Sequence, residues 1–229
     1  MGQMALGYGS EFHLLRMLGR RRSELNSEIL EQLKTNGTIE WLDFVPDPGS
    51  YIPDREYRDV EFLSGSEAFD EIAEDFRLYW PTSRNTQNWD GVAKQGNMWI
   101  LAEAKARIKE IESDCGASDL GSLELIGRAF EQTINAYNIN ASADVWKLRY
   151  YQKANRIAFL NFLEHHGVEA HLVFIYFMNG YDNGTSSESV KHKGEWEAAI
   201  EREDKYLGIF GNQVIASKIS NVFIDVRSR

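Results

Sequence analysis

The stretch of sequence that decides the fold runs from residue 89 to residue 105 and reads WDGVAKQGNMWILAEAK. Two apolar segments, 89–93 and 98–105, flank a polar turn at residues 94–97, a pattern typical of a β-hairpin. The second segment is apolar on both faces, as expected for a strand in the middle of a covered sheet. The sequence therefore predicts a central hairpin with charged side chains near the end of its second strand.

Three ionisable side chains of this hairpin are expected to share one face. Successive side chains of a strand point to opposite faces, so Glu103 and Lys105 point the same way. If the turn has two or four residues, Asp90 lies opposite Leu101 or Glu103, and both registers put it on the face of Glu103. An odd-length turn would put Asp90 on the other face.

A metal ion would compensate the charges on this face, because burying an unpaired charge is costly. Two carboxylates, a backbone carbonyl and waters suit Mg²⁺ (or Mn²⁺), a hard cation that prefers oxygen ligands. Asp90 and Glu103 are the expected metal ligands. Beside the metal, Lys105 could position or deprotonate an attacking water, or neutralise charge on a phosphate in the transition state.

The hairpin contains Trp89-Asp90-Gly91 and then Glu103-Ala104-Lys105, with twelve residues between Asp90 and Glu103. This order and spacing resemble the signature of the PD-(D/E)XK nuclease superfamily. The resemblance covers mainly residues 66–178, and the Pro that often precedes the Asp is replaced here by Trp89. It implies a restriction-endonuclease-like core made of a helix, a mixed sheet of about four strands and a second helix. It also implies that Asp90 and Glu103 bind metal, that Lys105 is catalytic, and that the products carry a 5′-phosphate and a 3′-hydroxyl.

Four more side chains are candidates for additional site or nucleic-acid contacts: Glu74, Gln152, Asn155 and Arg156. Many members of the superfamily use a Glu from the helix before the hairpin, and the angles of the available glutamates do not select one of Glu67, Glu71 and Glu74. The other three candidates are spaced by three and four residues, which places them on one helix face. An ordinary polar helix face is an equally good interpretation of that spacing.

Apolar spacing predicts the elements on either side of the hairpin. Helices are expected at 11–34 with a break near Gly19, at 66–81 with Ser66 as its cap, and at 121–139, 145–165 and 194–206; strands are expected at 39–45, 170–178 and 222–226. Strands separated by helices predict an α/β fold, with a central mixed β-sheet flanked by helices on both faces. We expect one domain over residues 1–229, with an N-terminal helical extension to about residue 65 and a core over about 66–229.

Composition limits the partners of the chain. A formal net charge of −10 counts against tight binding of DNA or RNA by the whole surface. Basic residues are nevertheless grouped locally, at Arg16, Arg20, Arg21 and Arg22 and at Lys147, Arg149, Lys153 and Arg156. A single cysteine, the absence of a secretion signal and the absence of a bilayer-spanning apolar stretch predict a cytoplasmic protein with no membrane partner.

These observations favour a Mg²⁺-dependent endonuclease that hydrolyses phosphodiester bonds, with DNA as the expected substrate and restriction, defence or repair as the setting. Symmetric cleavage of duplex DNA would require a homodimer. The alternative is a catalytically inactive module on the same fold that binds nucleic acid or protein. A metal-dependent hydrolase of small phosphate esters also stays open, although no Gly-rich nucleotide-binding loop supports it.

Overall fold

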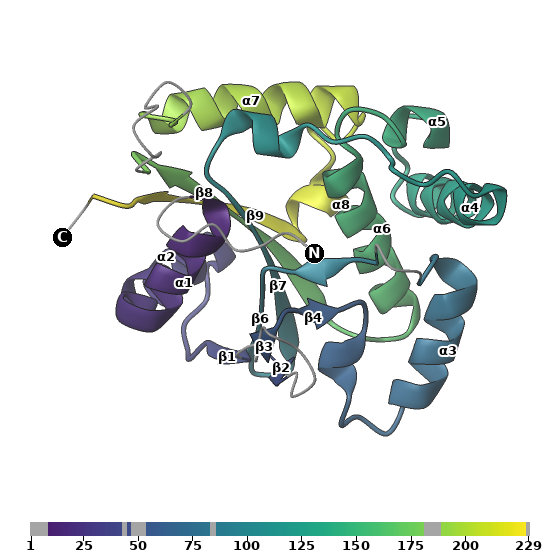
Figure 1. Cartoon of the computed structure of the whole chain (residues 1–229), viewed down its shortest axis with the longest axis horizontal. Helices are drawn as coiled ribbons and strands as arrows, with labels where there is room; N and C mark the ends of the chain where they lie inside the picture. The colour runs from purple at the N-terminus through teal and green to yellow at the C-terminus, as the bar shows by residue number, and fades with distance from the viewer. Residues whose placement is uncertain (1–8, 43–44, 47–53, 83–85, 181–188, 228–229) are drawn as a thin grey trace.

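The computed structural model describes residues 9–42, 45–46, 54–82, 86–180 and 189–227 of the 229-residue chain. Among these residues, the largest sheet has five strands in the order β1-β6-β7-β8-β9 (Figure 1). The strands are Glu40–Leu42 (β1), Gly91–Gln95 (β6), Met98–Lys105 (β7), Ala170–Met178 (β8) and Ile219–Asp225 (β9). Strands β1, β6 and β7 are antiparallel neighbours, whereas β7, β8 and β9 run parallel.

The β6–β7 hairpin has a turn of even length. Gln95 pairs with Met98, which leaves Gly96 and Asn97 in the turn. Gly96 adopts a φ of 61°, a left-handed conformation that glycine accepts without steric cost. The parity that the sequence argument assumed is therefore confirmed.

Helices cover both faces of the sheet (Figure 1). One face packs against α1 (Ser10–Arg20) and α2 (Arg22–Leu33), and the other packs against α3 (Phe69–Tyr79), α4 (Leu120–Ala136), α6 (Tyr151–His165) and α7 (Lys193–Tyr206). The side chains of β7 alternate between these two cores: Ile100 and Ala102 face α1 and α2, whereas Trp99 and Leu101 face the larger group of helices. The predicted mixed sheet with helices on both faces is confirmed.

Residues 10–42 contribute directly to the sheet and its cover. Strand β1 pairs with β6, and Trp41 on β1 donates a hydrogen bond from Nε1 to Asn26 Oδ1 of α2 at 2.7 Å. The Trp41 ring fills the space beside Gly91, where an added Cβ would lie 2.9 Å from its Cζ3 atom. A glycine is therefore required directly after Asp90 if the strand is to pack here.

Shorter elements connect this framework. Strand β2 (Val45–Pro46) pairs with β3 (Asp54–Arg55), and β4 (Tyr57–Arg58) pairs with β5 (Asn88–Trp89). The remaining elements are the 3₁₀ turns η1 (Glu61–Leu63) and η2 (Ile108–Ile111) and the short helices α5 (Ala143–Trp146) and α8 (Gln213–Ala216). Most of the proline-containing loop after the first strand, residues 47–53, lies outside the described residues.

Two predicted helices differ from the observed ones. The helix expected at 145–165 is interrupted, because α5 ends at Trp146 and Arg149 adopts a left-handed φ of 47° before α6 begins. Ser66 does not cap the helix expected at 66–81, since α3 begins at Phe69 without a side-chain cap. No described helix combines the length and apolar character needed to cross a membrane.

The predicted strands differ mainly in length. Strand β8 has the predicted bounds, whereas β9 begins at Ile219 and is longer than expected. The strand expected at 39–45 is shortened to β1, and residues 43–44 lie outside the described part of the chain.

Burial of a neutral histidine in β8 should make stability depend on pH. The ring of His171 contacts Ser220 Oγ at 2.9 Å, and burial, with a smaller effect of Lys218, lowers the pKa of His171 to about 4 from 6.5. The unfolded chain therefore binds more protons than the folded chain between pH 6.5 and 4, so this residue costs stability as pH falls through that window. Relative to a His171→Gln variant, the protein should lose up to about 1.4 kcal/mol per pH unit there.

Urea denaturation at several pH values measures this difference. The matched control is His165→Gln, because His165 is exposed in the last turn of α6. Parallel stability profiles for the protein and the His171→Gln variant would contradict the burial of a neutral imidazole.

Candidate active site

Asp90 lies where an extended segment changes its pairing partner. The residues before it form β5, which pairs with β4, and the residues after it form β6, which pairs with β1 and β7. Because Gly91 pairs with Ala102, Asp90 lies at the level of Glu103. Its Oδ2 atom accepts a hydrogen bond from the Ala104 N–H at 2.7 Å. The register and this bond hold the Asp90 carboxyl group beside the charged end of β7.

Glu103 has hydrogen-bond donors at both carboxylate oxygens, although its side chain is almost fully buried. Oε1 accepts from Lys105 Nζ at 2.6 Å and from Gln152 Nε2 at 2.7 Å. Oε2 accepts from Arg156 Nε at 2.9 Å and from Arg156 Nη2 at 2.8 Å. Two N–H groups of one guanidinium thus donate charge-assisted hydrogen bonds to a single carboxylate oxygen, and such bonds are stronger than those between neutral groups. Glu103 therefore joins β7 to the first turns of α6.

Arg156 extends this network to the segment that precedes Asp90. Its Nη1 atom donates to Gln87 Oε1 at 3.1 Å and to Asn155 Oδ1 at 3.3 Å. Its Nη2 atom donates to the Asn88 carbonyl at 2.6 Å, and the guanidinium lies 4.4 Å from the centre of the Trp89 ring. One arginine thus connects α6, β5 and β7.

The two carboxyl groups have opposite pKa shifts. Burial raises the pKa of Glu103, but Lys105 and Arg156 outweigh burial, so that the pKa lies below its usual value. For Asp90, burial and the charge of Glu103 raise the pKa well above its usual value, and the opposing effects of Lys105 and the Ala104 N–H are smaller. Burial lowers the pKa of Lys105, but Glu103 and Asp90 together raise it above its usual value. The charge of Glu103 is compensated, whereas the charge of an ionised Asp90 is not.

A divalent cation fits better beside the Asp90 carboxylate than beside the Glu103 carboxylate. Asp90 Oδ1 accepts no hydrogen bond from the described residues, and a cation there would supply the missing positive charge. At Glu103, a cation would have to displace one of the existing donors. Within the described ranges, no three His, Cys, Asp or Glu side chains are grouped as a metal site. Water or substrate oxygens would therefore have to complete the coordination.

A pocket of about 390 Å³ opens beside Asp90, at the start of α6. Its lining combines neutral hydrogen-bonding groups, two aromatic side chains, one carboxyl group and one arginine: Trp80, Thr86, Gln87, Asn88, Asp90, Ser113, Tyr151, Gln152, Asn155 and Arg156. Gln87 Nε2 is buried without a hydrogen-bond partner among the described residues. This amide N–H is therefore an unsatisfied donor in the wall of the pocket.

The structure brings most of the sequence-predicted residues together. Asp90, Glu103 and Lys105 meet at the end of the hairpin, and the predicted helix face of Gln152, Asn155 and Arg156 lies against them. This face is buried or half-buried and is not an ordinary solvated helix face.

Glu74 lies apart from this group. It is exposed on α3, and its neighbour Asp75 pairs with His166 at 3.1 Å. His166 follows the last residue of α6, roughly 20 Å along the helix from Gln152. The structure does not bring Glu74 to the hairpin.

Two glutamates near the site were missed by the sequence analysis. Glu56 precedes β4, and burial followed by the charges of Glu11 and Glu103 raises its pKa. Glu11 lies in the first turn of α1, where burial and then Glu110 raise its pKa while Lys105 lowers it. Neither residue has a signal in the local sequence, because long-range packing of α1 and pairing of β4 with β5 place them.

The chain matches no protein-family model, and no curated protein or solved structure is significantly similar to it. The resemblance to the PD-(D/E)XK superfamily rests on the sequence motif of the hairpin and stays a prediction.

Removing Arg156 should strongly destabilise the protein. An Arg156→Met variant leaves the buried Glu103 carboxylate with Lys105 as its remaining cation and leaves the Asn88 carbonyl without this donor. Breaking a buried charge pair in this way typically costs about 3–5 kcal/mol, and we expect a loss of unfolding free energy in that range.

Guanidinium denaturation at neutral pH measures this loss. The control is Arg128→Met, at an exposed position of α4, which should change stability by no more than about 0.5 kcal/mol. If Arg156→Met were as stable as this control, Glu103 would not depend on Arg156.

Proposed function

We propose that the chain is a metal-dependent nuclease that hydrolyses phosphodiester bonds. Asp90 and Glu103 would hold Mg²⁺ (or Mn²⁺), Lys105 would be the catalytic cation, and DNA would be the substrate. The observation that carries the proposal is the meeting of Asp90, Glu103 and Lys105 beside a pocket, with the charge of Asp90 uncompensated. Perturbed carboxyl groups at a pocket are typical of functional sites.

The order of elements supports this proposal. We also propose that the core is restriction-endonuclease-like, in line with the resemblance of its hairpin motif. Helices α1 and α2 precede the antiparallel strands β1, β6 and β7, and α4 to α6 lie between β7 and its parallel neighbour β8. A helix, a mixed sheet and a second helix are the parts that the resemblance implies.

In this mechanism Lys105 acts as a cation and not as a base. A bound divalent cation would polarise the phosphate and lower the pKa of a water ligand. Because Glu103 and Asp90 raise the pKa of Lys105, its ammonium group keeps its proton at neutral pH. It can then donate a hydrogen bond to a phosphate oxygen as negative charge grows there in the transition state. This favours the charge-neutralising role among those considered from the sequence.

The residues around this centre would position it and receive the substrate. Gln152 and Arg156 hold the Glu103 carboxylate in one orientation. Tyr151 gives the pocket an aromatic surface, and Asn155 adds an amide. Such walls suit the sugar and base next to the scissile phosphate, since bases stack on aromatic rings and hydrogen-bond to amides.

A cleavage assay tests the proposal. Supercoiled plasmid and labelled single-stranded DNA and RNA are incubated with the protein and Mg²⁺ or Mn²⁺, with EDTA as the blank. The Asp90→Ala and Lys105→Ala variants should lose activity by at least about 100-fold. A Glu74→Gln variant, changed at an exposed position of α3, should keep full activity. Cleavage that survives both Asp90→Ala and Lys105→Ala would sink the proposal.

The complete pairing of Glu103 favours a second candidate function. In a non-catalytic module that binds nucleic acid or protein, Lys105, Glu103 and Arg156 would form a purely structural charge network. Calorimetry with Mn²⁺ separates the two candidates. The enzyme should bind the ion and lose binding on Asp90→Asn, a change that keeps an acceptor for the Ala104 N–H. No binding at millimolar Mn²⁺ would favour the module.

A further inference from the structure

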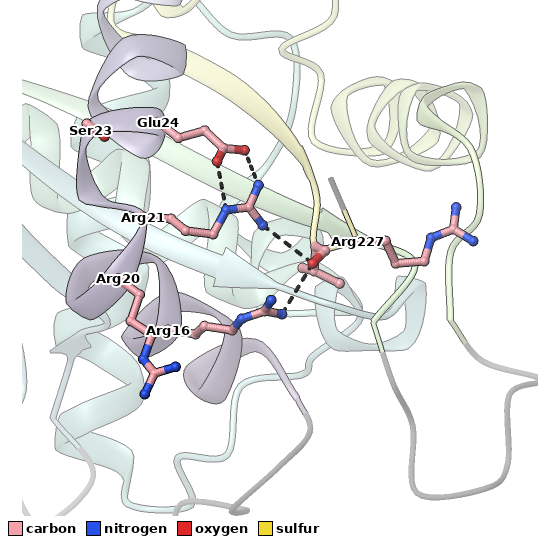
Figure 2. Close-up of a pocket in the computed structure, with 7 residues that line it drawn as sticks. Arg16, Arg20, Arg21, Ser23, Glu24 and Arg227 are labelled. Atoms are coloured by element: carbon pink, nitrogen blue, oxygen red, sulfur yellow. Dashed lines mark hydrogen bonds and ion pairs between the residues drawn. The ribbon is translucent and has the colours of Figure 1, made fainter. Parts of the chain in front are cut away.

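A second pocket lies where α1 and α2 meet the end of β9 (Figure 2). It has a volume of about 670 Å³ and is lined by Arg16, Arg20, Arg21, Ser23, Glu24, Val226 and Arg227. Four of these seven residues are arginines, although the chain as a whole carries a net charge of −10. We call this site the arginine pocket.

Two guanidinium groups of the arginine pocket converge on one acceptor. Arg16 Nη1 donates to the Val226 carbonyl at 3.2 Å, and Arg21 Nη1 donates to the same oxygen at 3.4 Å. Figure 2 shows both side chains reaching this oxygen, Arg16 from α1 and Arg21 from the junction with α2. Like charges held this close repel each other unless a counter-charge lies nearby.

The carboxylates near the pocket compensate half of its arginines. Arg21 Nε donates to Glu24 Oε2 at 2.7 Å, and Arg227 Nη2 lies 3.4 Å from Asp225 Oδ2. Arg16 and Arg20 are exposed, and neither has a carboxylate partner among the described residues. The pocket therefore has a local surplus of positive charge and N–H donors that are not used by the protein. Guanidinium groups suit phosphate in particular, because they bind two of its oxygens at once.

The arginine pocket lies at the same end of the strands as the candidate active site, although α1 and α2 cover the face of the sheet opposite α6. Lys105 pairs with Tyr176, which in turn pairs with Phe223, and Val226 lies three residues further along the chain. Two strand spacings and three residues correspond to about 10 Å in each direction, so the backbone at Lys105 and the backbone at Val226 are roughly 14 Å apart within the plane of the sheet.

We propose that the arginine pocket binds a backbone phosphate of a nucleic-acid strand, away from the bond that Asp90 and Glu103 would cleave. The identity of the ligand rests on the proposed nuclease function. Arg16 and Arg20 would donate most of the hydrogen bonds to the phosphate, because they lack carboxylate partners among the described residues. This site gives an acidic chain a local means of holding a polyanion.

Binding without cleavage tests this proposal. Fluorescence anisotropy in EDTA follows binding of a labelled duplex and of its single strand over a range of KCl concentrations. An Arg16→Gln, Arg20→Gln double variant should bind at least about 10-fold more weakly near 0.1 M KCl. For the duplex, the slope of log K against log[KCl] should fall by about 1 for each phosphate that the variant no longer neutralises. The matched control is an Arg77→Gln, Arg128→Gln double variant, which removes the same charge from exposed positions on α3 and α4.

Equal oligonucleotide affinity of the protein and of its Arg16→Gln, Arg20→Gln variant would overturn the proposal. Equal losses of affinity in the two double variants would also overturn it, because they would indicate a general effect of charge. Inorganic phosphate is titrated in parallel. Loss of phosphate binding with unchanged oligonucleotide binding would also overturn it, because the pocket would then hold a small free anion. If the double variant does not fold, Arg20→Gln alone replaces it, with an expected loss of about 3-fold in affinity.

The outcome is independent of the cleavage assay, because no divalent cation is present. Binding that depends on Arg16 and Arg20 in a protein without cleavage would contradict the nuclease and support the pocket. Cleavage by a protein whose nucleic-acid binding does not depend on Arg16 and Arg20 would support the nuclease and contradict the phosphate site in the arginine pocket.

Discussion

The buried charge cluster of Glu103, Lys105 and Arg156 is the interaction on which the site depends. A carboxylate that is 2% exposed stays ionised only because an ammonium and a guanidinium lie against it. Through the same contacts, Arg156 binds β5 and β7 to the start of α6. The cluster therefore fixes the hairpin, the helix and the pocket between them in one arrangement.

Asp90 differs from Glu103 although the two lie at the same level of neighbouring strands. Glu103 contacts two cations, whereas Asp90 accepts one backbone N–H, and burial followed by the charge of Glu103 raises the pKa of Asp90. The arrangement thus favours added positive charge beside a pocket, which is the physical basis of the proposed cation site. The arginine pocket at the junction of α1, α2 and β9 supplies positive charge for a polyanionic substrate at a place separate from Asp90.

Local patterns in the sequence were sufficient to predict the hairpin and the charged face. The turn at Gly96 fixed the parity that puts Asp90 beside Glu103, and the apolar run of β8 gave its bounds. The break before α6 was not predictable, because Arg149 takes its left-handed conformation where its N–H donates to Asp114 Oδ1, far back in the chain, at 2.6 Å. Glu56 reaches the site through pairing of distant strands, which spacing along the sequence does not reveal.

The proposed function requires that Asp90 and Glu103 share one divalent cation. Anomalous diffraction from a crystal soaked in Mn²⁺ tests it most directly, because the manganese signal locates the ion without reference to activity. We expect a manganese peak within coordinating distance of a carboxylate oxygen of both residues, at about 2.0–2.5 Å. A crystal with no peak at the hairpin, or with Glu103 still bound only by Lys105, Gln152 and Arg156 at saturating Mn²⁺, would contradict it.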